Sequence, residues 1–265
     1  ESLLAGQRRF VLDNTYADAK SRAPALALGA RFGVPVRCVW VDTPEHEAMV
    51  NACLRMIARR GRLLDAEEIK AASKDDPNLF PPVAVRSFFQ RVERPAPSEG
   101  FAAVEIAPFR RRWPSEHTER ALILDYDGTL RPEDVALLPG RKEVLAAFVA
   151  DGWLLLGVSN QSAVARGQLS SETVRACFDR TNELLGVSID VRWDEHPSGP
   201  IHNWTRKPMP GLGVQLILDH HLDPARCVFV GDMESDREFA ANCGFRYAEA
   251  RDFFEDEGHR FVRGE

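Results

Sequence analysis

The sequence predicts an α/β fold with parallel strands, divided into two successive domains. Short apolar runs rich in Val, Ile and Leu alternate along the chain with longer segments of helical apolar spacing, and this alternation is typical of parallel sheets covered by helices. It is interrupted over 110–119, the polar stretch RRRWPSEHTE. We therefore expect a first domain at 1–112, a linker at 113–119 and a second domain at 120–265.

The first domain shows a β-α-β-α order that begins with a short apolar run. Pro24 permits a kink in the first helix, Gly33 closes that helix, and Thr43 and Pro44 suit the start of the second. Proline and turn residues then dominate until a last strand. The expected elements are an apolar run at 8–14, a helix at 17–33, a strand at 34–42, a helix at 43–61 and a strand at 102–109.

The second domain repeats the alternation with longer and more apolar strands. Each expected strand is followed by a segment of helical periodicity, so a three-layer α/β domain results. The expected strands are 120–128, 153–160, 187–193 and 226–232, and the expected helices are 140–152, 170–186, 210–222 and 234–244.

Composition indicates a globular, cytoplasmic protein. The 265 residues are 44% hydrophobic and 28% charged, which is enough apolar content for two modest domains. No apolar run is long enough to span a membrane, and the start has no signal-peptide centre, so we expect no membrane partner. The five cysteines are scattered without a C-x-x-C pair, which favours buried apolar side chains over disulfides or a zinc cage.

Charge is unevenly distributed between the halves of the chain. Residues 1–112 carry 18 Lys and Arg against 14 Asp and Glu, whereas residues 113–265 carry 16 against 26. The basic half could therefore face a polyanion. The acidic half would need a metal or a local cation to bind one.

Polar side chains follow several strands of the second domain at the point where each strand ends. They are Asp125 and Asp127, then Ser159 and Asn160, then Asp232 and Asp236, with Lys207 before a helix. Ligands of parallel α/β sheets gather at this edge. Carboxylates brought together there need a cation, and oxygen ligands suit Mg²⁺ shared with a substrate phosphate. The pattern therefore predicts a magnesium-dependent site for a phosphoryl group.

Four segments resemble, in order, the motifs of the haloacid-dehalogenase-type phosphatases. They are DYDGT at 125–129, VSNQS at 158–162, RKPMPG at 206–211 and GDMESD at 231–236. The resemblance implies a Rossmann-like phosphatase domain in which Asp125 is the nucleophile that becomes an aspartyl phosphate. It also implies that Asp127 protonates the leaving oxygen and later deprotonates the attacking water.

The same resemblance implies the remaining roles. Ser159 and Lys207 would hold the phosphoryl oxygens, and Asp236 would orient Lys207 or the metal's waters. The Mg²⁺ ligands would be Asp125, Asp232 and the main-chain carbonyl of Asp127. Substrate contacts beyond the phosphate are expected from Asn160, Arg166 and Arg206. Arg131 lies near a motif end as well, and for the arginines the alternative of a plain surface cation stays open.

Two features bear on the substrate. The segments 130–157 and 163–205 are too short for an inserted cap, so we expect an open pocket. SNQSAVARG at 159–167 is similar to a subgroup that contains histidinol-phosphate, heptose-bisphosphate and polynucleotide 3′-phosphatases, of which the first two usually carry a zinc loop. Here Asp194, Asn203 and Thr205 stand where cysteines would be expected, so we expect no zinc, and surface positions for His196 and His202.

The first domain resembles part of the P-loop kinase domain of polynucleotide kinase-phosphatases. The resemblance rests on residues 10–51 and 81–109, with PSEGF at 97–101 as the most specific piece. It implies that Asp13 lines a kinase site. An arginine among Arg55, Arg59, Arg60 and Arg62 would be the lid residue, although a solvated basic helix face is the favoured alternative.

The sequence has no G-x-x-x-x-G-K-[ST] segment, so we expect no kinase activity and infer that upstream sequence has been lost. We interpret the chain as a Mg²⁺-dependent phosphomonoesterase, with polynucleotide 3′-ends in nucleic-acid repair as the main hypothesis for its substrate. Two alternatives stay open: a phosphatase for a small sugar or histidinol phosphate, and a non-catalytic nucleic-acid-binding scaffold.

Overall fold

The computed structural model describes residues 2–6, 9–132, 136–199, 203–256 and 258–263. It divides into two compact units. Unit 1 comprises residues 1–45 and 83–111, and unit 2 comprises residues 46–82 and 112–265. The expectation for His202 falls outside the described residues.

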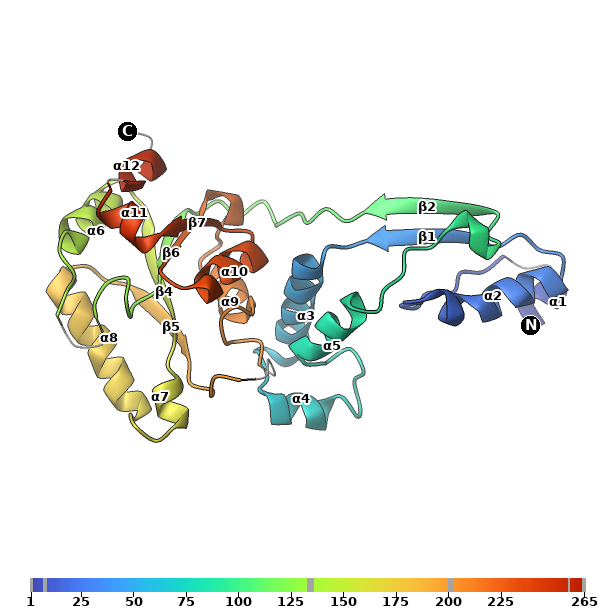
Figure 1. Cartoon of the computed structure of the whole chain (residues 1–265), viewed down its shortest axis with the longest axis horizontal. Helices are drawn as coiled ribbons and strands as arrows, with labels where there is room; N and C mark the ends of the chain where they lie inside the picture. The colour runs from blue at the N-terminus through green and yellow to red at the C-terminus, as the bar shows by residue number, and fades with distance from the viewer. Residues whose placement is uncertain (1, 7–8, 133–135, 200–202, 257, 264–265) are drawn as a thin grey trace. The chain divides into compact units, whose positions relative to one another are not determined.

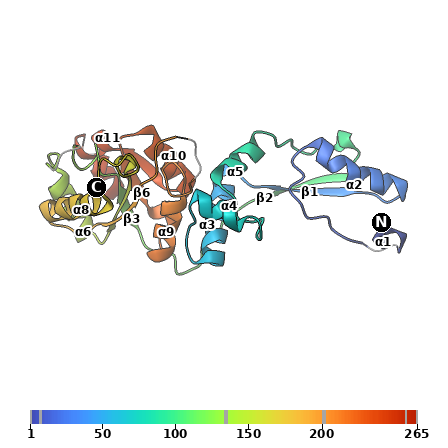
Figure 2. The same cartoon turned by 90° about the horizontal axis from the view of Figure 1, so that it is seen from below.

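Unit 1 is built on two parallel strands that run side by side in Figure 1 and overlap in the turned view of Figure 2. Strand β1 (Arg37–Asp42) pairs with β2 (Ala103–Pro108), with Arg37 opposite Ala103 and Asp42 opposite Pro108. The expected strands at 34–42 and 102–109 are thereby confirmed. The helical elements are α1 (Ser2–Ala5), α2 (Ala19–Arg31), α5 (Pro82–Phe89) and the 3₁₀ turn η1 (Pro97–Glu99).

A buried arginine ties the segments of unit 1 together. Arg22 on α2 is almost fully buried and donates through Nε and Nη2 to the two carboxylate oxygens of Glu99, at 2.8 and 2.9 Å. Its Nη1 donates to the carbonyls of Tyr16 and Glu93. Because this bidentate pair joins residues 77 positions apart, it fixes η1 against α2.

Unit 2 contains a sheet of five parallel strands in the order β5-β4-β3-β6-β7. The strands are β3 (Ala121–Leu124), β4 (Leu154–Asn160), β5 (Asp190–Asp194), β6 (Val228–Gly231) and β7 (Arg246–Glu249). The central strand β3 is buried at every position, as its continuous apolar run predicts. Its side chains alternate between two apolar clusters, one on each face of the sheet.

Helices cover both faces of this sheet (Figure 1). The cluster with Leu122 and Leu124 includes residues of α6, α8 and α11, and the cluster with Ala121 and Ile123 includes residues of α9 and α10. This gives the three layers that the alternating pattern predicts. The helices are α6 (Arg141–Ala150), α7 (Ser162–Ala165), α8 (Ser171–Leu185), α9 (Gly211–Asp219), α10 (Glu234–Cys243), α11 (Ala250–Phe254) and α12 (Gly258–Arg263), with a 3₁₀ turn η2 (Pro224–Arg226).

Residues 46–82 group with the five-stranded sheet and not with unit 1. They contain most of α3 (Glu45–Arg60) and all of α4 (Ala66–Ala72). Trp204 Nε1 donates to the carbonyl of Phe80 at 3.0 Å, and the amide of Ala66 donates to Asn203 Oδ1 at 3.2 Å. The compact units thus do not coincide with a single boundary at 112, because residues 46–82 group with the second half of the chain. The division into domains at 1–112, 113–119 and 120–265 stays a prediction.

Several elements were missed by the sequence patterns. The helices α4 and α5 lie in the stretch interpreted as proline-rich turns. Each is at most eight residues long, too short for helical periodicity to show. Strand β7 was missed as well; it has four residues, and all of them pair with β6. Among the described residues, no helix is both long and apolar enough to cross a membrane.

Candidate active site

The site lies where the strand order of the sheet switches direction. From β3 the chain first adds β4 and β5 on one side and then returns to add β6 and β7 on the other. The carboxyl ends of β3, β4 and β6 therefore meet at a crevice, where open α/β sheets bind their ligands. Asp125, Ser159 and Asp232 lie at or just beyond these three strand ends.

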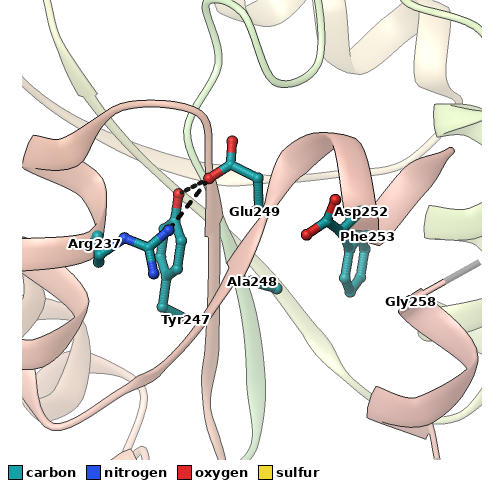
Figure 3. A pocket seen from close by; sticks show the side chains of 7 residues that line it. All are labelled: Arg237, Tyr247, Ala248, Glu249, Asp252, Phe253 and Gly258. Atoms are coloured by element: carbon teal, nitrogen blue, oxygen red, sulfur yellow. Dashed lines mark hydrogen bonds and ion pairs between the residues drawn. The ribbon is translucent and has the colours of Figure 1, made fainter. Parts of the chain in front are cut away.

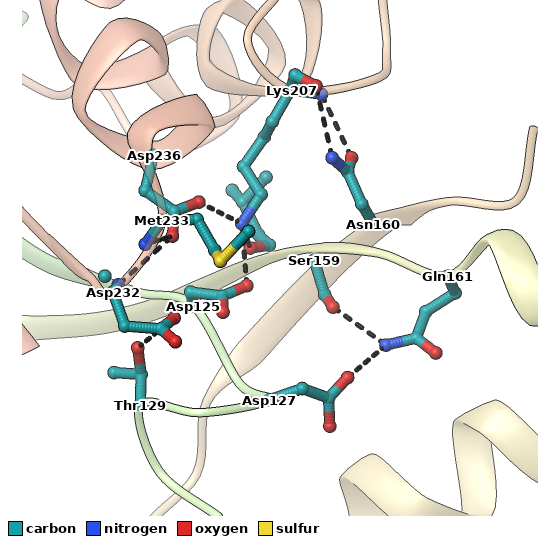
Figure 4. Close-up of polar contacts among 12 residues, drawn as sticks. Asp125, Asp127, Thr129, Ser159, Asn160, Gln161, Lys207, Asp232, Met233 and Asp236 are labelled. Atoms are coloured by element: carbon teal, nitrogen blue, oxygen red, sulfur yellow. Dashed lines mark hydrogen bonds and ion pairs between the residues drawn. The ribbon is translucent and has the colours of Figure 1, made fainter. Parts of the chain in front are cut away.

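Lys207 links two buried carboxylates at this edge (Figure 4). Its Nζ lies 2.6 Å from Asp125 Oδ1 and 2.7 Å from Asp236 Oδ1, and it also donates to the carbonyl of Val158 at 2.9 Å. Its main chain is held by Asn160, which accepts from Lys207 N at 3.0 Å and donates to Lys207 O at 3.1 Å. The end of β3, strand β4 and helix α10 thus each supply an acceptor to one ammonium group.

Asp232 completes a group of three carboxylates. Oxygen atoms of Asp125, Asp232 and Asp236 all lie within 4.8 Å of one another. Gly128 lets Asp232 approach, because a β-carbon at Gly128 would lie only 2.3 Å from Asp232 Oδ2. The hydroxyl of Thr129 lies 3.5 Å from Asp232 Oδ1. Three carboxylates beside one ammonium leave two negative charges, so the donor set fits a hard divalent cation.

Burial and charge shift the pKa values of these groups. Burial raises the pKa of Asp125 to about 7, although the neighbouring Lys207 opposes the shift. Burial also raises the pKa of Asp232, with a further contribution from Asp236. For Lys207 burial acts downward, but the carboxylates of Asp125 and Asp236 outweigh it and raise its pKa. Lys207 is therefore a permanent positive charge in the site.

The carboxylate of Asp127 faces away from Lys207 and toward β4. Gln161 Nε2 donates to Asp127 Oδ2 at 2.7 Å and to the buried Ser159 hydroxyl at 2.9 Å (Figure 4). Arg131 holds the other oxygen, Oδ1, through Nε and Nη2, each at 3.1 Å. The sequence had suggested Asp127 as a metal ligand only through its main-chain carbonyl, and its side chain is not in the group of three carboxylates.

The expected substrate contacts behave differently from one another. Asn160 lies in the site and orders Lys207. Arg206 instead donates to the carbonyl of His196 at 3.0 Å, and Arg166 donates to Ser162 and Gln168 on its own surface segment. Among the described residues, no ion pair joins Arg166 or Arg206 to Asp125, Asp232 or Asp236, and Arg206 Nη1 lies 3.7 Å from Asp194 Oδ1 instead. Their role in substrate binding stays a prediction.

Gln161 is the functional candidate that sequence reasoning missed. It directly follows Asn160, the last residue of β4, but the motif resemblance assigned roles in this segment only to Ser159 and Asn160. Its bond to Asp127 spans 34 positions of sequence and depends on the pairing of β3 with β4. Its position within the VSNQS segment, two residues after Ser159, was the one feature of the sequence that could have indicated a role for Gln161.

The positions compared with a zinc loop form a hydrogen-bonded group. Asp194 is buried, and its Oδ2 lies 2.8 Å from His196 Nδ1 and accepts from the Thr205 hydroxyl at 2.6 Å. Asn203 accepts instead from the amide of Ala66. One carboxylate, one imidazole and one hydroxyl without a thiolate do not fit a structural zinc site. His196, expected at the surface, is partly exposed and bound to Asp194.

A pocket of about 270 Å³ lies beside β7 and α11 (Figure 3). Its lining includes Arg237, Tyr247 and Glu249 but none of the site carboxylates. The hydroxyl of Tyr247 lies 2.9 Å from Glu249 Oε2 and 2.8 Å from the carbonyl of Gly231, the residue before Asp232. The pocket therefore adjoins the segment that leads to Asp232 but is separate from the group of three carboxylates.

The segments between the motifs hold little besides the core elements. In the described part of 130–157 there is one helix, α6, followed by the start of β4, and the described part of 163–205 holds the rest of α7, then α8 and β5. No separate cap domain is formed by these described residues. The open pocket that the spacing of the motifs predicts stays a prediction.

Comparisons with known families match both parts of the chain. A family model described as AAA domain matches residues 1–73, and one described as HAD-hydrolase-like matches residues 204–248. The second match contains Lys207, Asp232 and Asp236.

Relatives of known function match about half of the chain. A D-glycero-D-manno-heptose-1,7-bisphosphate 7-phosphatase of Thermosynechococcus vestitus is 35% identical over 146 residues, covering 47% of this chain and 74% of the relative. The corresponding phosphatase of Bordetella bronchiseptica is 29% identical over 138 residues, covering 47% and 76%. A solved D,D-heptose 1,7-bisphosphate phosphatase from B. bronchiseptica, complexed with magnesium and phosphate, is 25% identical, covering 53% of this chain and 87% of its own, with a TM-score of 0.46.

The class of protein follows from the fold, the site and these matches together: a phosphoric monoester hydrolase built on a parallel α/β sheet. The chain belongs to the haloacid-dehalogenase (HAD) family of phosphatases, and a P-loop-kinase-like segment precedes its phosphatase part. The relatives are named for a sugar bisphosphate, so they lend no support to the expected polynucleotide 3′-phosphatase.

Proposed function

We propose that the protein is a magnesium-dependent phosphatase for a small sugar phosphate or bisphosphate, which acts through an aspartyl phosphate on Asp125. The observation that carries the proposal is Lys207 Nζ, which lies within 2.7 Å of both Asp125 and Asp236 at the carboxyl edge of the sheet. A cation held there neutralises a nucleophilic carboxylate and the oxygens of an arriving phosphoryl group. The sugar substrate is supported by the names of the relatives.

Asp125 is the proposed nucleophile. Its carboxylate attacks phosphorus and forms the aspartyl phosphate, while the ester P–O bond breaks. Asp127 gives its proton to the leaving alkoxide in this step. In the second step Asp127 takes a proton from water, which attacks the same phosphorus, so that inorganic phosphate leaves and the Asp125 carboxylate is restored. Ser159 is buried at the end of β4 and is proposed to hold a phosphoryl oxygen.

Mg²⁺ fits the acidic group by its charge and its ligand chemistry. Asp125 and Asp232 are the proposed ligands, together with the main-chain carbonyl of Asp127, while Asp236 is engaged by Lys207 and by the amides of Asp232 and Met233. When bound, a divalent cation neutralises charge on the transferring phosphoryl group.

A polynucleotide 3′-end is the second candidate substrate. It is favoured by the AAA-domain match at residues 1–73, which precedes the phosphatase part in the order kinase, then phosphatase. The open pocket that the motif spacing predicts would admit such an end. Contacts to a phosphate backbone would make its binding depend steeply on salt, whereas binding of a small sugar phosphate would depend on salt weakly.

The deciding experiment compares phosphate release from two substrates in the presence of Mg²⁺. One is D-glycero-D-manno-heptose 1,7-bisphosphate and the other is an oligonucleotide with a 3′-phosphate, with Asp125→Asn as the blank. Turnover of the heptose bisphosphate that disappears in Asp125→Asn supports the proposal. Turnover confined to the oligonucleotide would replace the sugar by the second candidate, and turnover that persists in Asp125→Asn would remove the proposed nucleophile.

A further inference from the structure

The turn that follows the nucleophile brings a buried arginine back onto Asp127. Arg131 N donates to Tyr126 O at 3.2 Å, and Gly128 N donates to Arg131 O at 2.7 Å, so the chain closes on itself within six residues. Gly128 has a φ of +86°, which suits this reversal. Arg131 is thereby placed beside Asp127 by the backbone, before any side-chain contact is counted.

Helix α8 packs against Arg131 through the ring of Phe178. The guanidinium carbon of Arg131 lies 5.8 Å from the centre of the Phe178 ring, which packs edge-on against Tyr126 at 4.7 Å. Tyr126 is in turn fixed through its hydroxyl, which donates to Asn182 Oδ1 at 2.9 Å. Arg131 is 5% exposed. A long side chain that is packed on this many sides has little freedom to leave Asp127.

One polar atom of Arg131 has no partner in the described part of the chain. Its Nη1 is buried and finds no hydrogen-bond acceptor among the described residues, whereas Nε and Nη2 both reach Asp127 Oδ1. An unpaired buried nitrogen costs stability, and such groups in a native structure call for a functional reason. The guanidinium thus directs two of its three nitrogens to one oxygen of Asp127.

We propose that Arg131 is a positioning residue for Asp127, which together with Gln161 fixes the carboxylate in the orientation needed for proton transfer. Arg131 holds Oδ1 and Gln161 holds Oδ2, so both rotations of the side chain are restrained. The Asp127 side chain remains 34% exposed, and a substrate can still reach it. This inference rests on the proposed function, since it assigns to Asp127 the proton given to the leaving alkoxide.

Substrates whose leaving groups differ in their need for a proton distinguish a positioning role of Arg131 from a purely structural one. p-Nitrophenolate is a stable anion that departs without protonation, whereas a sugar or nucleoside alkoxide needs the proton from Asp127. General acid catalysis contributes about 10²–10⁴-fold. We expect Arg131→Met to lower kcat on the alkyl phosphate by about 10–100-fold and on p-nitrophenyl phosphate by less than about 3-fold.

The experiment measures kcat for both esters in the wild type, Arg131→Met, Gln161→Met and Asp127→Asn. The alkyl phosphate is whichever of the heptose bisphosphate and the 3′-phosphorylated oligonucleotide the wild type hydrolyses. Arg180→Met is the matched control, because Arg180 is exposed and pairs with Glu183 on α8. We expect Arg131→Met and Gln161→Met to share the leaving-group selectivity of Asp127→Asn, and Arg180→Met to behave as wild type.

Equal losses on both esters in Arg131→Met, beside a selective loss in Asp127→Asn, would overturn the positioning role while leaving Asp127 as the acid. Unchanged activity of Arg131→Met would overturn it as well. If Arg131→Met does not fold, Arg131→Lys and Gln161→Met carry the test, and absence of selectivity in both rejects the proposal. A wild type without Asp125-dependent turnover of either alkyl phosphate would show that the proposed function itself fails.

Discussion

Gly128 offers a sharp test of the proposed metal site, because two separate costs of Gly128→Ala can be worked out from the structure. The first is backbone strain: φ is +86°, a conformation that costs an L-residue about 1–2 kcal/mol. The second is contact: the new β-carbon would lie 2.3 Å from Asp232 Oδ2, so the carboxylate has to retreat by about 1 Å to reach ordinary van der Waals distance.

The strain alone is reproduced by a matched variant. Gly152 also has a positive φ, +75°, and a β-carbon there would meet nothing within 4 Å. Both variants should lose about 1–2 kcal/mol of stability, seen as a Tm lower by about 2–8 °C for a protein of this size. Gly128→Ala should in addition raise the Mg²⁺ concentration for half-maximal activity by about 10–100-fold, which is the range seen when metal ligands lose their support.

The assay is phosphate release titrated with Mg²⁺, together with thermal unfolding in the absence of metal. Gly152→Ala is expected to keep the magnesium requirement of the wild type. If Gly128→Ala shows the same requirement as Gly152→Ala, then Asp232 is not the ligand that Gly128 accommodates, and the argument for the metal site is refuted.

Three further predictions follow from the buried charges. Lys207→Met leaves the carboxylates of Asp125 and Asp236 without their cation, so the metal-free protein should lose about 3–5 kcal/mol in urea unfolding, and Lys207→Arg should lose less. Because the pKa of Asp125 is raised to about 7, its contribution to the stability of the metal-free protein is full below about pH 4 and is lost as the pH rises through 7. Thermal unfolding of the wild type should therefore show lower stability at about pH 8 than at about pH 5.5, and Asp125→Asn should show a smaller difference between the two pH values. In unit 1, Arg22→Met strands Glu99 and should speed amide hydrogen exchange in α2 relative to the amides of β3, whereas unchanged exchange would mean that the pair does not hold α2 in place.

The phosphatase elements could be predicted from the sequence because their patterns are local. Apolar runs such as 121–124 bury both faces of a strand, and Gly186 and Gly244 end helices in the left-handed conformation that glycine adopts most easily. Three motifs at strand ends and a fourth before α9 were sufficient to indicate Asp125, Asp232 and Lys207, since parallel strands bring their carboxyl ends to one edge. The family of phosphatases follows from those motifs.

Only the tertiary structure decided which side chains touch. No local pattern predicts that Gln161 reaches Asp127 across the β3–β4 pair, or that residues 46–82 pack with the five-stranded sheet through Trp204 and Asn203. These contacts join positions 34 to 137 residues apart. Arg131 is the plainest case, because the sequence shows only that it lies near a motif end. Arg131 packs against Phe178 and donates to Asp127 because folding brings the turn at 126–131 next to α8.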